Sequence, residues 1–293
     1  MNEVSALYKF YLQDRLLIGP SGYMLEWVVH HMPWGKDWHV DHTKRIVYPR
    51  IDYTGDNSVE SQNDAIRSLL ERASQSKTFR VLGKWRNELY PVHGMSGKVS
   101  MERSASPLFG INSYGVHLTA YVREGDQIRL WVPRRSSSKQ IYGGMLDNTV
   151  AGGISQGEAV MECLIREAEE EASFPKDLIQ HHAKPCGTVS YFFVRDEKAG
   201  GEVGLLQPEC QFVYDLEVDK NVIPEPNDDE VEDFQLWTVD HVQEAMAEGQ
   251  FKPNCAMVLL DFFIRHGILT PDNEDNYAEI ESRLHRKLPF PTR

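Results

Sequence analysis

Three glutamates, Glu167, Glu170 and Glu171, are spaced so that they share one face of a predicted helix. At 3.6 residues per turn, positions i, i+3 and i+4 are neighbours on a helix surface. Three carboxylates at that spacing repel one another, and a hard divalent cation such as Mg²⁺ removes the repulsion and supplies a Lewis acid. We expect Arg166 to hold one of these carboxylates through a bidentate hydrogen bond. The competing interpretation is a solvated acidic helix face, because glutamate-rich helices are common.

The residues before these glutamates predict where the helix begins. Ser155 followed three residues later by Glu158 fits a capping box, so the pattern predicts a helix over residues 156–172. Gly152 and Gly153 come just before it, and a glycine backbone lets a metal ion or a phosphate approach closely.

The elements around this helix predict a mixed α/β sandwich. Alternating apolar residues predict a strand over 116–122 and a second over 128–132, joined as a hairpin by a turn at 123–126. Further strands are expected at 186–195, 203–217 and 234–237, and further helices near 240–248, 254–266 and 274–284. Strands and helices that follow one another over short links are typical of an α/β fold.

The N-terminal third of the chain is less regular. A length of 293 residues allows one large domain or two modest ones. Apolar periodicity predicts a helix over 58–75, whereas the first 55 residues read as short strands and loops and residues 79–90 as extended chain. We place a soft domain boundary near residue 105.

Composition and charge narrow the class of protein. The net charge is −13, from 31 basic and 44 acidic residues, so the surface should repel nucleic acids and anionic membranes. The sequence has no run of about 18 apolar residues, so a transmembrane helix is not expected, and its first 11 residues lack the features of a signal peptide. The four cysteines form no CxxC pair, which favours a reducing, cytoplasmic location.

Residues 152–174 match the pattern G-x5-E-x7-R-E-U-x-E-E-x-G-U, in which U is aliphatic. The matching positions are Gly152, Glu158, Arg166, Glu167, Glu170 and Glu171. This pattern is the Nudix box, and the chain resembles Nudix hydrolases. The sequence departs from the box at Ser173, where the family has glycine, and at Ala168 and Phe174, which are weak versions of aliphatic positions. The resemblance implies a Nudix α/β/α sandwich over residues 106–293 and a smaller N-terminal α+β domain over residues 1–105.

Further segments resemble one branch of this family. They are residues 101–103, 109–111, 114–117, 131–136, 144–148, 150–153 and 251–256, with Lys139. The branch comprises fungal, plant and bacterial proteins, some of them fused to thiamine pyrophosphokinase. The resemblance implies a diphosphatase for thiamine-type diphosphates, including the damaged oxo and oxy forms, with a monophosphate and phosphate as products. It also implies Mg²⁺ as the cofactor, with Mn²⁺ as an alternative.

The Nudix pattern implies roles for individual residues. The metal ligands would be Glu167, Glu170, Glu171 and the Gly152 carbonyl, and Glu158 would hold a second metal through water. One glutamate would act as the base toward the attacking water, and the pattern leaves open which one. Glu230, in an acidic segment downstream, is the favoured additional acid; the alternative is an acidic solvated loop.

Substrate contacts are expected from two kinds of residue. Arg134, Arg135 and Lys139 are the candidates to grip the diphosphate, against the alternative of plain surface charge. Asn148 either touches the substrate or fixes a turn. Tyr191, which shares a strand face with Phe193, is a candidate to contact a flat ring, although one face of that strand should be core.

Three other functions are compatible with parts of the pattern. The first is a Nudix hydrolase of nucleotide substrates such as ADP-ribose or NADH. The second is an isomerase of isopentenyl diphosphate, which shares the fold, although no cysteine lies in a suitable strand-end position. The third is a catalytically silent module that binds a diphosphate or a partner protein; such modules usually lose a box glutamate, and this chain keeps them all. Residues 1–105 could form a lid, complete the base pocket or make the surface of a homodimer.

Overall fold

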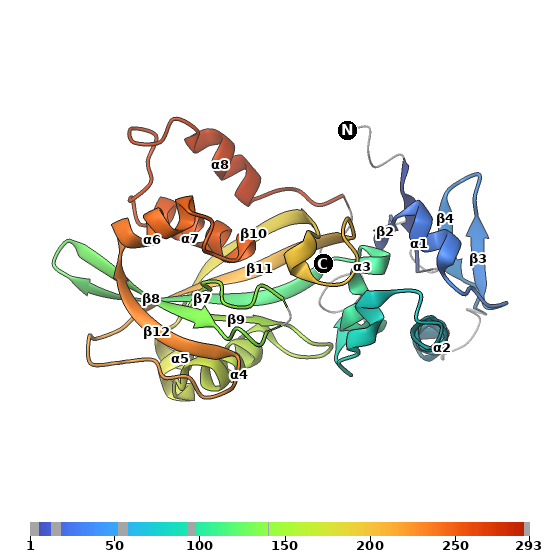
Figure 1. Cartoon of the computed structure of the whole chain (residues 1–293), viewed down its shortest axis with the longest axis horizontal. Coiled ribbons are helices and arrows are strands. Elements are labelled where there is room, and N and C mark those ends of the chain that lie inside the picture. Colours follow the sequence, from blue (N-terminus) through green and yellow to red (C-terminus); the bar gives the residue numbers. More distant parts are fainter. Residues whose placement is uncertain (1–5, 13–18, 52–57, 93–97, 140, 290–293) are drawn as a thin grey trace.

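The structure is a computed structural model, and it describes residues 6–12, 19–51, 58–92, 98–139 and 141–289. The chain forms a larger mixed α/β domain and a small N-terminal α+β domain, which lie side by side (Figure 1). The α/β fold predicted from the sequence is therefore confirmed.

The larger domain is built on a six-stranded sheet. Its strands run in the order β10-β11-β7-β8-β12, and β9 also pairs with β7. Their bounds are β7 (Ser113–Glu124), β8 (Gln127–Arg135), β9 (Val150–Gly153), β10 (Lys184–Val194), β11 (Leu206–Glu217) and β12 (Val231–Thr238). β11 and β7 are parallel, and the other pairs are antiparallel. Because β9 pairs with the first half of β7 and β8 with its second half, β7 is the central strand of the sheet.

Helices cover both faces of this sheet, as Figure 1 shows. α4 (Val160–Ala172) and α5 (Lys176–His182) lie on one face, and α6 (Val239–Ala247), α7 (Pro253–Arg265) and α8 (Tyr277–Leu284) lie on the other. β7 is buried along ten consecutive residues because it faces a helix layer on each side. Its even-numbered residues, from Tyr114 to Val122, pack with α4, which fixes that helix against the sheet.

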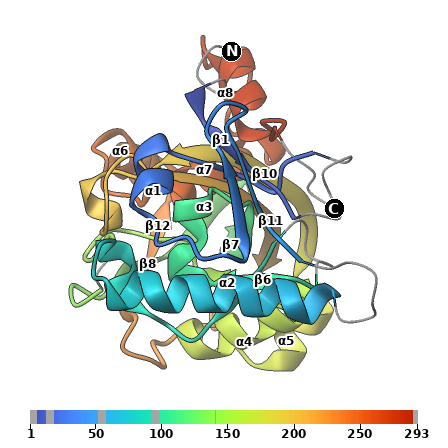
Figure 2. The same cartoon turned by 90° about the vertical axis from the view of Figure 1, so that its right-hand side faces the viewer.

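The N-terminal domain contains a four-stranded sheet in the order β2-β1-β4-β3. The strands are β1 (Tyr8–Phe10), β2 (Gly22–Met24), β3 (Trp38–Asp41) and β4 (Ile46–Pro49), followed by a separate pair, β5 (Leu89–Pro91) and β6 (Ser100–Glu102). The helices are α1 (Glu26–His31), α2 (Ser58–Gln75), the 3₁₀ turns η3 (Arg80–Lys84) and η4 (Arg103–Ala105), and α3 (Ser106–Phe109). α2 lies along one side of the domain (Figure 2) and buries one apolar stripe in its core.

Most predicted elements are found, and some are corrected. The helix with the glutamates begins at Val160, four residues later than predicted, because the Glu158 carboxylate caps the Ser155 N–H in the preceding loop. Residues 79–90 are only partly extended: the Glu202 carboxylate accepts hydrogen bonds from the N–H groups of Arg80 and Val81 and so caps η3. The short helix α1 lies where the sequence predicts only short strands and loops, and α3 and α5 lie in segments for which it predicts no element.

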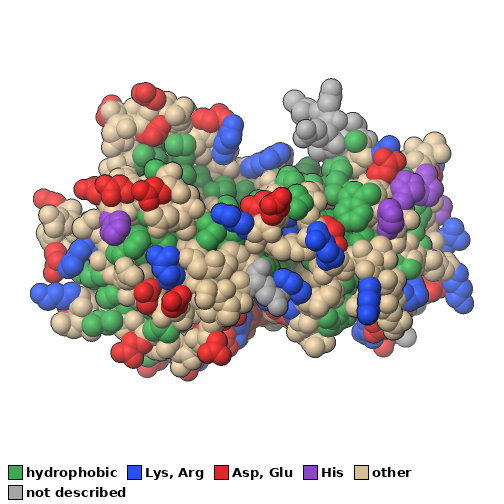
Figure 3. Space-filling model, in the orientation of Figure 1, with side chains coloured by type: hydrophobic (Ala, Val, Ile, Leu, Met, Phe, Trp, Pro, Cys, Tyr) green, Lys and Arg blue, Asp and Glu red, His purple; other side chains and the backbone are tan. Residues whose placement is uncertain are grey.

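Acidic and basic side chains are interspersed over the face shown in Figure 3. Among the described residues, no helix has the length and apolarity needed to cross a lipid bilayer.

Candidate active site

Arg166 on α4 is the centre of the acidic cluster. Its guanidinium donates two hydrogen bonds to the Glu158 carboxylate, over 2.8 and 3.2 Å. Its Nη1 also donates to Glu167 over 2.9 Å and to Glu170 over 3.0 Å. The bidentate contact is thus made to Glu158 rather than to one of the three helix glutamates, for which the sequence predicts it.

Glu167 and Glu171 project from α4 onto strand β9. Glu171 is buried, and its carboxylate accepts a hydrogen bond from the Ala151 N–H over 2.9 Å. A Cβ on Gly152 would lie 2.0 Å from the Glu167 carboxyl carbon, so only glycine leaves room for Glu167 against the strand. Burial raises the pKa of Glu167 against the opposing charge of Arg166. Burial and the Glu167 charge raise the pKa of Glu171 well above its usual value, which indicates a shortage of positive charge here.

This set of oxygen donors fits a hard divalent cation. Carboxylate and carbonyl oxygens are the ligands that Mg²⁺ prefers, and crowded, buried carboxylates are stabilised by it. Within the described part of the chain, no three His, Cys, Asp or Glu side chains converge on a common point. The reason is visible in the contacts, since Arg166 draws Glu158, Glu167 and Glu170 toward itself. Arg166 contacts one oxygen of Glu167 and one of Glu170, which leaves the second oxygen of each carboxylate for a bound cation.

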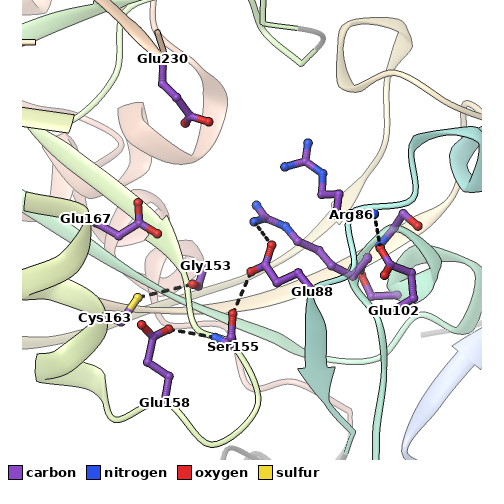
Figure 4. A network of polar contacts seen from close by, with 12 residues as sticks. Arg86, Glu88, Glu102, Gly153, Ser155, Glu158, Cys163, Glu167 and Glu230 are labelled. Atoms are coloured by element: carbon purple, nitrogen blue, oxygen red, sulfur yellow. Dashed lines mark hydrogen bonds and ion pairs between the residues drawn. The ribbon is translucent and has the colours of Figure 1, made fainter. Parts of the chain in front are cut away.

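A cavity of about 530 Å³, here called the polar cavity, opens beside these glutamates. Glu167, Glu170 and Glu171 line it together with Glu230 and Lys139. Lys139 and Glu230 form an ion pair; burial works against ionisation of Glu230, but Lys139 more than offsets it and lowers the pKa of the carboxyl group. In Figure 4, Glu167 and Glu230 point from different sides toward the same opening. The structure therefore brings Glu167, Glu170, Glu171 and Glu230 together with the predicted cation Lys139.

Of the other residues predicted to contact the substrate, Arg135 lines the polar cavity, whereas Arg134 and Asn148 are not among its described lining residues. Arg135 lines the polar cavity, is mostly buried and forms an ion pair with Asp147. Arg134 is not among the described residues that line this cavity, because its guanidinium turns away and donates to the Gly144 carbonyl over 2.9 Å. Asn148 is also outside the lining: it is buried, accepts a hydrogen bond from His117 Nδ1 over 2.7 Å and donates to the Cys255 carbonyl. The structure therefore assigns Asn148 to the support of the loop and speaks against a direct substrate contact by it or by Arg134.

The N-terminal domain supplies residues to the polar cavity that sequence reasoning missed. Arg86, Glu88 and Arg103 all line it. The Glu88 carboxylate accepts a hydrogen bond from the Ser155 hydroxyl over 3.0 Å and forms an ion pair with Arg103 over 2.8 Å (Figure 4). This contact joins the loop before α4 to the N-terminal domain. In the sequence, the segment at 101–103, which resembles the family branch, is the signal that points to Arg103.

A second cavity, of about 270 Å³, adjoins the first and is here called the aromatic cavity. The two cavities share residues in their linings: Arg103, Ile141, Ala151, Gly152, Gly153 and Lys252. Aromatic residues on the wall of the second cavity are Tyr90, Tyr114, Tyr142, Tyr191, Phe192 and Phe193. Tyr191 therefore lines this cavity, although most of its side chain is buried in the core. Lys252, at the junction, was missed although its segment at 251–256 carries part of the resemblance.

One carboxylate, Glu209 of β11, lies in the aromatic cavity. It accepts hydrogen bonds from the Tyr191 hydroxyl and from the side-chain amides of Gln207 and Gln211, the last over 3.0 Å. Burial and the Glu209 charge raise the pKa of Tyr191 well above its usual value, so the phenol stays protonated and donates.

The fold and the site, a helix of glutamates beside a cavity lined with cations, are those of a hydrolase of phosphoric anhydrides. Residues 114–255 match the family model described as NUDIX domain, and residues 51–113 match a domain of unknown function (DUF4743). A Nudix hydrolase of Deinococcus radiodurans is 31% identical over 133 residues, which are 45% of this chain and 68% of that protein. The chain belongs to the Nudix hydrolase family.

Other relatives extend the similarity into the N-terminal domain. An uncharacterized protein of Saccharomyces cerevisiae is 39% identical over 240 residues, which are 80% of this chain and 70% of that protein. Nudix hydrolase 20, chloroplastic, of Arabidopsis thaliana is 38% identical over 206 residues, and this chain spans 53% of its length. A crystal structure from Deinococcus radiodurans aligns with 50% of this chain at a TM-score of 0.38 and 23% identity.

Proposed function

We propose that this protein hydrolyses thiamine-type diphosphates, including the oxo and oxy forms, to the monophosphate and phosphate. The observation that carries the proposal is the pair of adjoining cavities. The polar cavity has the glutamates and cations that a diphosphate needs, and the aromatic cavity next to it offers ring faces to a flat heterocycle. The resemblance to the thiamine-related branch supports the same substrate class. We propose a cytoplasmic location for this activity.

The cations around the polar cavity are proposed to hold the diphosphate. Arg103 and Lys252 lie at the junction of the two cavities, and Lys139 and Arg135 line the polar cavity farther along. Guanidinium and ammonium groups pair well with phosphate oxygens. A substrate held by Arg103 and Lys252 would have its ring in the aromatic cavity and its phosphates beside α4.

The acidic residues are proposed to support the attack of water on a phosphorus atom. Mg²⁺, held by Glu167, Glu170, Glu171 and the Gly152 carbonyl with Glu158 acting through water, would neutralise phosphate oxygens and lower the pKa of a bound water. Glu230 lines the same cavity and is proposed as the base that takes the proton of the attacking water. Arg166 acts indirectly by orienting Glu158, Glu167 and Glu170.

The test is a comparison of substrates with Mg²⁺ present, with products separated by chromatography. The panel is thiamine, oxothiamine and oxythiamine diphosphates, ADP-ribose, NADH and dGTP. We expect kcat/KM for the best thiamine-type substrate to exceed that for any nucleotide by at least about tenfold, a difference that one well-placed recognition group can supply. Leading activity on ADP-ribose or NADH would overturn the substrate assignment while leaving the family intact.

A further inference from the structure

The Glu209 carboxylate has only neutral partners in the described structure. Its three donors are the Tyr191 phenol and the amides of Gln207 and Gln211. Among the described residues, no Lys, Arg or His forms an ion pair with it, in contrast to Glu88, Glu167 and Glu230 in the polar cavity. The carboxylate is also only partly exposed, and it shares its cavity with aromatic side chains.

Besides Arg103 and Lys252 at the junction, Arg195 also lines this cavity, and its hydrogen bonds go to groups other than Glu209. Its guanidinium donates to the Gln207 side-chain oxygen over 2.7 Å and to the carbonyls of Ala199 and Gly200. Gln207 therefore stands between the two charges. Burial lowers the pKa of Arg195, and the Glu209 charge acts in the opposite direction, so the two groups interact without direct contact.

A carboxylate in this setting is poised for a cationic ligand. A partly desolvated anion is costly unless it is paired, and three neutral donors fix its position without cancelling its charge. Aromatic faces attract cations as well, most strongly where water is excluded. The wall of the cavity thus combines a placed negative charge with the ring faces of Tyr90, Tyr191 and Phe193.

We propose that Glu209 is the counter-ion for a flat, positively charged heterocycle in the aromatic cavity, and therefore a specificity-determining residue. This inference rests on the proposed function, because it assigns the ring end of the same substrate. Arg103 and Lys252 at the junction hold the anionic end, so the ligand is a zwitterion with its two charges recognised in different cavities.

The charge of the ring separates substrates of similar shape. Thiamine and oxythiamine carry a cationic thiazolium ring, whereas oxothiamine has a neutral thiazolone in its place. A nucleotide offers a neutral purine. Glu209 should therefore favour thiamine and oxythiamine over oxothiamine, and any preference for oxothiamine must arise elsewhere in the cavity.

The test is the binding of rings without phosphate, measured by calorimetry. Thiamine and the neutral thiazolone of oxothiamine are titrated into the wild type, Glu209→Gln and a matched control, Glu197→Gln. Glu197 is the exposed first residue of the 3₁₀ turn η5 (Glu197–Ala199) after β10, and it is not among the described residues that line either cavity. A glutamine at 209 keeps the shape and one acceptor. Gln207, whose oxygen is held by Arg195, keeps donating to that acceptor, and the Gln211 amide can turn to accept from the new NH2 group.

We expect Glu209→Gln to weaken thiamine binding by at least about tenfold, in line with the loss of a charge-assisted contact, and thiazolone binding by less than about threefold. Glu197→Gln should change neither. Equal weakening of thiamine binding and thiazolone binding would show that position 209 only shapes the cavity, and would overturn the proposal. Unchanged thiamine binding in Glu209→Gln, or a wild type that binds neither ring, would also overturn it.

Hydrolysis of thiamine, oxythiamine and oxothiamine diphosphates is measured separately, so that the proposed function and the counter-ion role of Glu209 can fail independently. A wild type that binds thiamine through Glu209 but cleaves none of these diphosphates would overturn the proposed function and leave the counter-ion in place. If the wild type cleaves these diphosphates and Glu209→Gln keeps the same substrate preference, the proposed function stands and the counter-ion role of Glu209 is overturned.

Discussion

The Ser155 hydroxyl donates a hydrogen bond to the Glu88 carboxylate over 3.0 Å, and through this pair the N-terminal domain holds the loop in front of α4. The Gln156 N–H donates to the Leu89 carbonyl over 2.8 Å at the same place. Glu88 also binds Arg103 over 2.8 Å, at the junction of the two cavities. The N-terminal domain is therefore part of the candidate active site and not a separate attachment.

Replacing Glu88 with alanine should lower activity more than stability. The change removes the Ser155 contact and frees Arg103, two interactions of about 1 kcal/mol each, so we expect kcat/KM to fall roughly thirtyfold. Steady-state kinetics and thermal unfolding are compared with Glu71→Ala, an exposed glutamate on α2. If kcat/KM of Glu88→Ala equals that of the control, the N-terminal domain does not organise the site.

Arg166→Lys should raise the Mg²⁺ concentration that the protein needs for activity. A lysine keeps the charge but cannot reproduce the planar contacts to Glu158, Glu167 and Glu170. We expect the Mg²⁺ concentration for half-maximal activity to rise about tenfold, because supporting contacts of this kind are typically worth 10–100-fold in metal affinity. The measurement is activity against Mg²⁺ concentration, and an unchanged midpoint would exclude an orienting role for Arg166.

Gly152→Ala should abolish most of the activity, because the new Cβ would lie 2.0 Å from the Glu167 carboxyl carbon and displace that carboxylate. Overpacking of this kind costs about 1–3 kcal/mol, so the free energy of unfolding should fall by a similar amount. Gly83→Ala is the control, since an added Cβ there meets no atom within 4 Å. Full activity of Gly152→Ala would mean that Glu167 need not lie against β9.

His117 should make the protein less stable in mild acid. Burial and the Lys252 charge lower the pKa of His117 to about 4, whereas a histidine in an unfolded chain titrates near 6.5. The unfolded chain therefore binds more protons between these two values, and stability falls as the pH is lowered from about 6.5 toward 4. From pH 7.5 to pH 5.0 the loss from this group is about 2 kcal/mol, at 1.36 kcal/mol per pH unit. Urea unfolding of the wild type and His117→Gln at both pH values checks this, and an equal loss in both proteins would contradict it.

The sequence predicts the residues that are close together along the chain better than those brought together by folding. The helix of glutamates and the β7–β8 hairpin follow from the Nudix box and from periodicity, because each depends on a short segment. Glu88, Arg103 and Lys252 come from segments up to about 160 residues apart, and no local pattern links them (252 − 88 = 164). The sequence shows the charge of Arg134, which favours a contact with the diphosphate, but it does not show the hydrogen bond to the Gly144 carbonyl that turns this side chain away.

The most direct test of the account is the hydrolysis of thiamine diphosphate as Mg²⁺ is added back to metal-free protein. Wild type, Glu170→Gln and Glu169→Gln are compared. Both glutamates are exposed, but Glu170 lines the polar cavity, whereas Glu169 is not among the described lining residues. The account predicts activity that depends on Mg²⁺ in the wild type and in Glu169→Gln, and a loss of at least about 100-fold in Glu170→Gln, the scale of a removed electrostatic contact in catalysis. Hydrolysis that continues without a divalent cation, or an active Glu170→Gln variant, would contradict the central claim that the glutamates of α4 carry out a metal-dependent cleavage of a diphosphate.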